Sequence, residues 1–142
     1  MISSMTVHMV KLCVGADDVE DLKVWQRHLM KTAAKPYHHT RMVPKRAPEL
    51  LEGGSIYWVI RGVIQVRQRI FSVESFLDRQ GRRACEIVLE PEIVMVEPVP
   101  KRPFQGWRYL KADDAPSDLA ANRGSDELPP GIRAQLKQAL VW

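Results

Sequence analysis

Apolar and polar residues alternate along several short stretches of the chain, which is the pattern of half-buried β-strands. The stretches that we interpret as strands are 6–14, 55–60, 63–73, 83–90 and 93–99, with a further short one at 40–43. Both faces of 6–14 are largely apolar, so we expect this strand to lie in the middle of a sheet. Pro98 and Pro100 cannot donate hydrogen bonds to a neighbouring strand, so 93–99 is expected near an edge.

Helical periodicity follows the first predicted strand. Asp17 is the predicted N-cap, Glu20 is its capping-box partner, and an apolar stripe at helical spacing follows them. Trp25 belongs to this helix and is expected in the core. A short second helix is predicted at 48–51, closed by the glycines that follow it, and a third helix at 130–142.

Five or six short strands with two or three peripheral helices indicate an α+β protein with a mostly antiparallel sheet. We expect this sheet to curl into a small barrel or pseudo-barrel, because closure protects its edges. The 142 residues suit one domain, which is expected to cover 5–142. Residues 1–4 are expected to be a disordered extension, 100–111 an irregular segment, and 112–130 a surface loop.

The composition is that of an ordinary globular protein, with 45% hydrophobic and 27% charged residues. This composition argues against a membrane span, a coiled-coil rod and a disulfide scaffold. Cys13 and Cys85 each lie in an apolar run and are expected to be free core thiols. The start of the chain has neither the basic residues nor the apolar run of a signal peptide, so a cytoplasmic location is expected.

The net charge of +4 is unevenly distributed along the chain. Residues 41–111 hold thirteen Lys and Arg against eight Asp and Glu, whereas residues 112–127 hold one against five. The strand-rich middle of the chain therefore carries +5, and the acidic stretch after it carries −4. An excess of arginine favours an anionic partner, because a guanidinium binds phosphate through two parallel hydrogen bonds.

Two clusters combine cations with aromatic or imidazole rings. The first consists of Arg41, Lys45 and Arg46 beside His38 and His39, and the second of Lys101, Arg102, Phe104, Gln105, Trp107, Arg108 and Tyr109. Single-stranded nucleic acid requires both kinds of group, since its phosphates bind cations and its bases stack on rings. The alternative is a solvated surface on which Phe104 or Trp107 closes the end of the barrel.

Other chemistries have weaker signals. The side chains that would ligate a metal are His8, Cys13, His38, His39 and Cys85. They lack CxxC or HxxxH spacing, and adjacent histidines on an extended segment point in opposite directions. Ser55 follows two glycines but lacks the strand–turn–helix context of a hydrolase nucleophile. We therefore expect no metal and no cofactor.

A resemblance to a known family rests on three stretches of the sequence. These are TVHMVKLCVGADDVEDL at 6–22, RMVPKRAPELLEGGSIYWVIRGVIQVRQRI at 41–70 and RPFQGWRYLKADDAP at 102–116. Together they resemble a family of small alphaproteobacterial proteins known as domain of unknown function 1489. The family name implies no activity.

The order of the predicted elements is also similar, more loosely, to the PUA-like superfamily, which includes the ASCH and EVE domains. This resemblance implies a pseudo-barrel flanked by helices, with RNA or a modified nucleotide held in a basic and aromatic cleft. The ligand-binding residues that we expect on this basis are Arg41, Lys45, Arg46, Trp58, Arg67, Arg102, Phe104, Gln105, Trp107, Arg108 and Tyr109. Tyr57 and Trp58 alternate along one strand, so at most one of them lines such a cleft.

The leading hypothesis is a non-catalytic module that binds RNA or a nucleotide, with no membrane partner. One alternative is an enzyme acting on a nucleotide or RNA, like some ASCH-like proteins, with Lys45 or His39 and the strand residue Glu86 as acid and base. Another is a protein-interaction domain that uses the acidic 112–127 stretch and the proline-rich edge.

Overall fold

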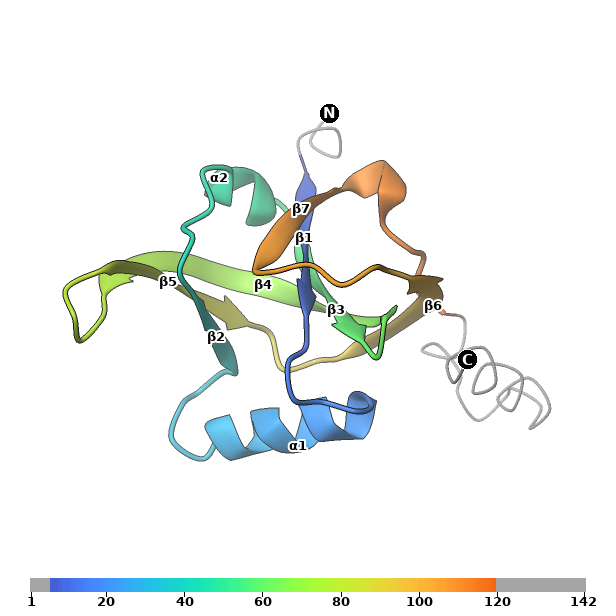
Figure 1. Ribbon diagram of the computed structural model, residues 1–142, viewed down its shortest axis with the longest axis horizontal. Coiled ribbons are helices and arrows are strands. Elements are labelled where there is room, and N and C mark those ends of the chain that lie inside the picture. Colours follow the sequence, from blue (N-terminus) through green and yellow to red (C-terminus); the bar gives the residue numbers. More distant parts are fainter. Residues whose placement is uncertain (1–5, 120–142) are drawn as a thin grey trace.

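Seven strands form one curled sheet within residues 6–119, which are the residues that this computed structural model describes (Figure 1). The strands are β1 Val7–Leu12, β2 Tyr37–Thr40, β3 Ser55–Ile60, β4 Val63–Leu77, β5 Arg83–Leu89, β6 Val94–Pro100 and β7 Trp107–Lys111. Their order in the sheet is β2-β5-β4-β3-β1-β7, and β6 pairs with β4.

The sheet is mixed, because β1 and β3 run parallel while the other neighbouring strands run antiparallel. A parallel pair needs a long crossover, and here the chain between β1 and β3 supplies it with both helices and β2. The predicted α+β architecture with a curled, mostly antiparallel sheet is confirmed. The barrel remains unclosed, since β2 and β7 end the strand order without pairing to each other.

The two helices lie at opposite ends of the sheet (Figure 1). They are α1, Val19–Leu29, and the short α2, Ala47–Leu50. The prediction of Asp17 as the N-cap of α1 is wrong by one residue, because the Asp18 carboxylate accepts the hydrogen bond from Asp21 N at 2.9 Å. Neither helix in the described part of the chain is long and apolar enough to cross a membrane.

The main departure from the sequence-based prediction is β7. The segment 100–111 was expected to be irregular, yet Trp107–Lys111 pairs antiparallel with β1. β2 also begins earlier than the predicted 40–43 strand, at Tyr37. The expected extension at 1–4, the end of the 112–130 loop and the helix at 130–142 lie outside the described residues.

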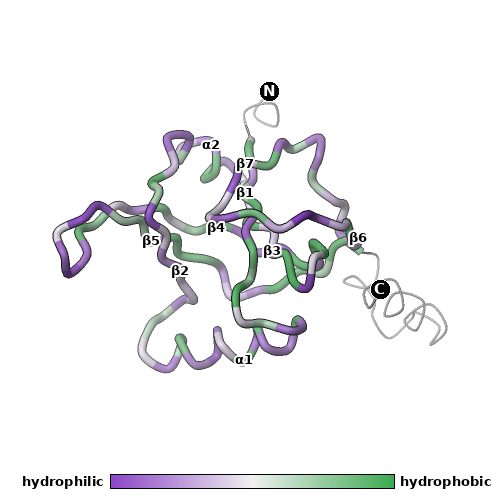
Figure 2. Tube along the Cα trace, viewed as in Figure 1, coloured by the Kyte–Doolittle hydropathy of each residue, from purple (hydrophilic) through white to green (hydrophobic). Residues whose placement is uncertain are grey.

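The core lies on both faces of the sheet, as the double-sided apolar pattern of β1 and β3 requires. Trp58 packs in the larger cluster with Met9 and Ile87, whereas Tyr57 packs in the smaller cluster on the other face. The prediction that Tyr57 and Trp58 face opposite ways is therefore confirmed. In Figure 2, apolar residues are concentrated on the inner strands of the sheet.

Candidate functional site

The segment between β2 and α2 lies against β7, and this contact joins the two clusters predicted from sequence. Trp107 Nε1 donates to the carbonyl oxygen of Met42 at 3.0 Å, across 65 positions of sequence. The backbone N–H of Arg46 donates to the hydroxyl of Tyr109 at 3.0 Å, and its guanidinium lies 5.3 Å from the centre of that ring. The first cluster and part of the second therefore form one surface.

The rings of this surface hold the segment in place and leave little area for a ligand. Trp107 is only 5% exposed, and its ring packs edge-on against Tyr109 with the centroids 4.9 Å apart. Arg46 is further bound by Glu49, whose carboxylate accepts from Nη2 at 2.6 Å and from Nε at 3.0 Å. Arg41 and Lys45 are exposed and make no ion pair with any described residue.

Strand alternation places Arg108 of the second cluster on the other face of β7. Arg108 points away from Trp107 and stacks over Phe104, with its guanidinium 5.2 Å from the ring centre. Phe104 packs partly into the smaller core cluster, while Arg102 and Gln105 are exposed. The sequence proximity of these residues therefore does not give one continuous site.

Two further predicted residues have structural partners. Arg67 forms a bidentate ion pair with Asp118, with both N–O distances 2.7 Å, and donates to Ser55 Oγ at 3.1 Å. It lines a wide groove of about 630 Å³ together with Arg69 and Phe71. Trp58 is 1% exposed, and its role is to form the floor of a different cavity.

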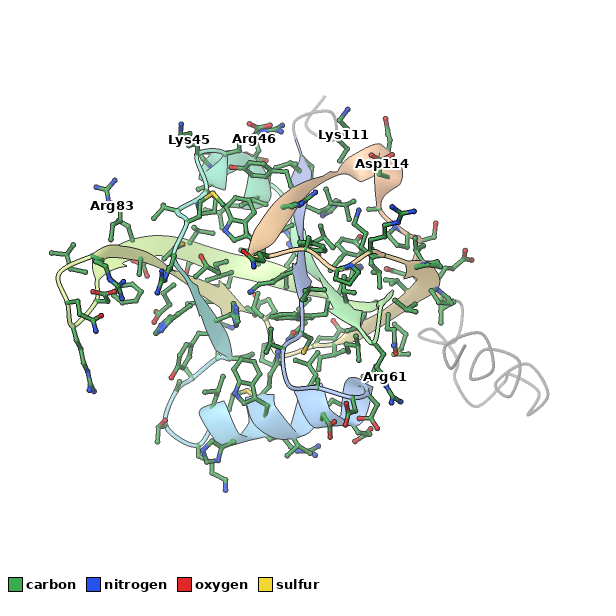
Figure 3. The ribbon with its side chains drawn as sticks, in the orientation of Figure 1. Lys45, Arg46, Arg61, Arg83, Lys111 and Asp114 are labelled. Carbon is green, nitrogen blue, oxygen red and sulfur yellow. The ribbon has the colours of Figure 1, made fainter. Side chains whose placement is uncertain are left out.

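Five cations form what we call the basic band: Arg41, Lys45, Arg46, Arg83 and Lys111. Figure 3 shows Lys45, Arg46, Arg83 and Lys111 along one side of the molecule, with Asp114 near Lys111 and Arg61 on the opposite side near α1. Thr40 pairs with Cys85, so the next residue, Arg41, lies beside the strand that carries Arg83. Neither Arg83 nor Lys111 was among the predicted residues. The fold alone brings Arg83 to the first cluster, whereas alternation along β7 from Tyr109 could have indicated Lys111.

An aromatic cavity of about 370 Å³ opens between α1 and the ends of β1, β2 and β3. Its lining residues are Cys13, Val14, Gly15, Ala16, Asp21, Leu22, Trp25, His38 and Trp58. His38 stands edge-on to both tryptophans, with its ring centre 5.4 Å from that of Trp58 and 6.2 Å from that of Trp25. Three π-systems thus form the walls and floor of one cavity.

The polar groups of the cavity are uncharged or lie at its edge. Burial lowers the pKa of His38 to about 4, and the charges of Lys11 and His39 add to this effect, so its imidazole is neutral at pH 7. Burial also raises the pKa of the Cys13 thiol to about 11, which keeps it protonated and unsuited to nucleophilic attack. A neutral imidazole can donate one hydrogen bond and accept another. Neither His38 nor Cys13 therefore brings a charge into the cavity at pH 7.

A buried amide network fixes the floor of the aromatic cavity. Gln68 Oε1 accepts from Trp58 Nε1 at 2.9 Å and from Gln26 Nε2 at 2.6 Å. Gln68 Nε2 donates in return to Gln26 Oε1 at 2.7 Å and to the Glu90 carbonyl oxygen at 3.1 Å. These bonds tie α1 to β4 directly behind the Trp58 ring, so the orientation of the ring depends on them.

His39 points to the opposite face of β2 from His38, as the alternation predicted. Its Nε2 lies 2.9 Å from Glu86 Oε1, so the acid–base pair considered for an enzyme does come together. The pair is half-exposed and lies outside the aromatic cavity. Within residues 6–119, no group of three or more His, Cys, Asp or Glu side chains could hold a metal ion.

Trp25 is the residue that the sequence analysis placed wrongly. It was expected in the core, yet it is 40% exposed, because the buried stripe of α1 consists of Leu22 and Gln26. Cys13 was expected to be a core thiol and His38 to lie beside the first basic cluster, and neither was expected to line a cavity with Trp25. The apolar spacing of α1 left either Trp25 or Gln26 on the buried face, so an exposed Trp25 was one of two possibilities in the sequence. The cavity itself could not be foreseen, because it depends on how α1 packs against the sheet.

The low pKa of His38 predicts a pH dependence of folding. Its pKa is lower in the folded chain than its ordinary value of 6.5, so the unfolded chain binds the proton more strongly. The free energy of unfolding is therefore expected to fall as the pH drops from 6.5 towards 4, by at most about 3 kcal/mol from this residue. Urea unfolding of the native protein and of His38→Gln at pH 7 and pH 4.5 measures how much of the pH-dependent change in the free energy of unfolding comes from His38.

His8 contributes in the same direction, because burial also lowers its pKa. The variant His28→Gln, which changes an exposed histidine of α1, should retain the full pH dependence. If the free energy of unfolding changed equally with pH in His38→Gln and in the native protein, the burial of a neutral His38 would be contradicted.

The sequence of residues 9–142 matches the family described as "Protein of unknown function (DUF1489)". No curated protein and no solved structure gives a significant match. The match covers both joined clusters, the aromatic cavity and nearly the whole sheet, and the chain belongs to the DUF1489 family.

Proposed function

We propose that this protein binds RNA, with one unpaired base in the aromatic cavity and the adjoining phosphates on the basic band. The proposal extends the looser PUA-like resemblance, and the curled sheet with its flanking helices supports it. The observation that carries the proposal is the cavity formed by Trp25, His38 and Trp58.

The cavity suits a planar heterocycle. Its volume of about 370 Å³ lies at the lower end of the range for small-molecule sites, and its lining is mainly apolar. Bases stack on aromatic side chains at about 1–3 kcal/mol per base. Neutral His38 offers a donor and an acceptor to the edge of a base, and the Asp21 carboxylate lies at the rim.

The basic band supplies the charge that an RNA chain requires. His38 lines the cavity, and Arg41 follows the end of the same strand, so the backbones of these two residues lie about 10 Å apart. Arg41 is thus the cation of the band that links it to the cavity, while Lys45 and Arg46 lie farther away beside α2 (Figure 3). Arg41 and Lys45 are exposed and have no ion-pair partner among the described residues. Phosphate contacts of this kind would supply most of the affinity and make it depend on salt.

A titration of fluorescently labelled, unpaired RNA at about 50 mM and 200 mM salt tests the proposal. Arg41→Glu combined with Lys45→Glu should weaken binding about tenfold or more at low salt and reduce the salt slope by about 1.4. The matched control is Arg27→Glu combined with Arg61→Glu, which changes the same charge on the α1 side. Absence of binding at low salt, or equal losses in the two double variants, would contradict the proposal.

A further inference from the structure

Strands β4 and β5 continue beyond the rest of the sheet as a two-stranded arm, residues 76–84. Glu74 pairs with Glu86 and Leu77 with Arg83, whereas the pairing of β2 with β5 stops at Cys85. The arm projects from one end of the molecule, and its tip is hydrophilic (Figures 1 and 2). In residues 76–84, β4 and β5 therefore pair only with each other.

The turn of the arm is organised by Asp78. Its Oδ1 accepts from the backbone N–H groups of Gln80 at 2.9 Å and Arg82 at 2.8 Å, and its Oδ2 pairs with the Arg82 guanidinium at 3.2 Å. These hydrogen bonds lower the pKa of Asp78, chiefly the bond from the Arg82 backbone. A two-stranded ribbon is marginally stable by itself, so the network serves to keep the tip in one shape.

The side chains at the tip have no role in the core. Leu77 is 70% exposed, and Arg79 and Arg83 are exposed without an ion-pair partner among the described residues. The tip has three arginines against a single carboxylate, and Asp78 is already neutralised by Arg82. A shaped, cationic projection of this kind fits a polyanion.

We propose that the arm binds the double-helical part of the same RNA whose unpaired base enters the aromatic cavity. This inference rests on the proposed function. Double-helical RNA exposes a wide, shallow minor groove bordered by phosphates, and proteins recognise it mainly by shape. The ribbon lies across this groove, with Arg79 and Arg83 on the phosphates and Leu77 over the sugars.

Two observations define the limits and the position of this contact. Glu74 and Glu86 face one another at the base of the arm and would repel phosphates, so the contact is confined to the tip. Thr40 at the end of β2 pairs with Cys85 at the base of the arm, and His38 of the same strand lines the cavity. A stem next to an unpaired base can therefore reach both features.

The test compares an RNA hairpin with an unpaired oligomer of the same loop sequence. Arg79→Glu should weaken binding of the hairpin about fivefold or more while changing binding of the oligomer less than about twofold. Arg83 is left unchanged, because it also belongs to the basic band. The neutral variant Arg79→Gln should give a smaller loss with the same selectivity. Arg27→Glu serves as the charge-matched control, and circular dichroism checks that each variant folds.

Equal losses for the two RNAs would overturn the inference, because the arm would then act only through net charge. Unchanged binding of the hairpin by the arm variants would overturn it as well, while leaving the proposed function in place. Failure of the native protein to bind either RNA would contradict the proposed function itself, and the arm inference with it.

Discussion

Replacing Trp25 by alanine is expected to weaken binding of a free nucleoside between about fivefold and a hundredfold. Trp25 forms one wall of the aromatic cavity, and removal of its ring takes away one stacking surface for the base. The side chain is 40% exposed and lies off the buried stripe of α1, so the free energy of unfolding should change little. Isothermal titration calorimetry with a panel of nucleosides measures the loss.

Two further variants make this result specific. Trp25→Phe keeps a ring in the same wall and should recover part of the affinity. Val24→Ala changes an exposed apolar residue at the neighbouring position of α1, outside the cavity lining, and should bind like the native protein. Equal affinities for Trp25→Ala and the native protein would exclude the cavity as the base-binding site.

Replacing Gln68 by leucine is expected to lower the free energy of unfolding by about 2–5 kcal/mol. The substitution removes the acceptor of Trp58 Nε1 and both hydrogen bonds of the Gln26 amide, and all of these groups are buried. A buried donor without a partner costs about 1–3 kcal/mol. Urea unfolding followed by circular dichroism measures the change.

A double-mutant cycle distinguishes loss of the hydrogen-bond network from other effects of each substitution on the free energy of unfolding. Gln26→Leu combined with Gln68→Leu removes both amides, so it should cost less than the sum of the two single variants. The two glutamine side chains contact each other, and additivity is therefore not expected. Additive losses, or a loss below about 0.5 kcal/mol for Gln68→Leu, would show that the network does not hold the cavity floor.

The strands could largely be predicted because their side chains alternate, and alternation reflects which face is buried. β7 could not, since Pro103 and Gly106 indicate a loop, and its pairing partner β1 lies about a hundred positions earlier. The same strand explains why the residues of the second cluster lie on two different faces. Alternation along β7 directs Trp107 and Tyr109 towards the 41–46 segment and Arg108 towards Phe104.

The candidate site was only partly predictable. The sequence identified the cations of the 41–46 segment, but it assigned Trp58 to a cleft with Phe104 and Trp107, whereas Trp58 lines a different cavity beside α1. It did not identify Trp25 or His38 as cavity walls, because they meet only when α1 packs beside β2. Arg83 joins the basic band for a similar reason, through the pairing of β2 with β5.

Photo-crosslinking tests the central claim most directly. An RNA with thiouridine at one unpaired position is bound to the native protein, irradiated, and the crosslinked peptides are identified by mass spectrometry. The account predicts crosslinks in the peptides that contain Trp25 or His38, and their loss in the presence of excess free nucleoside. Crosslinks found only on the basic band or elsewhere, and unaffected by nucleoside, would contradict the placement of a base in the aromatic cavity.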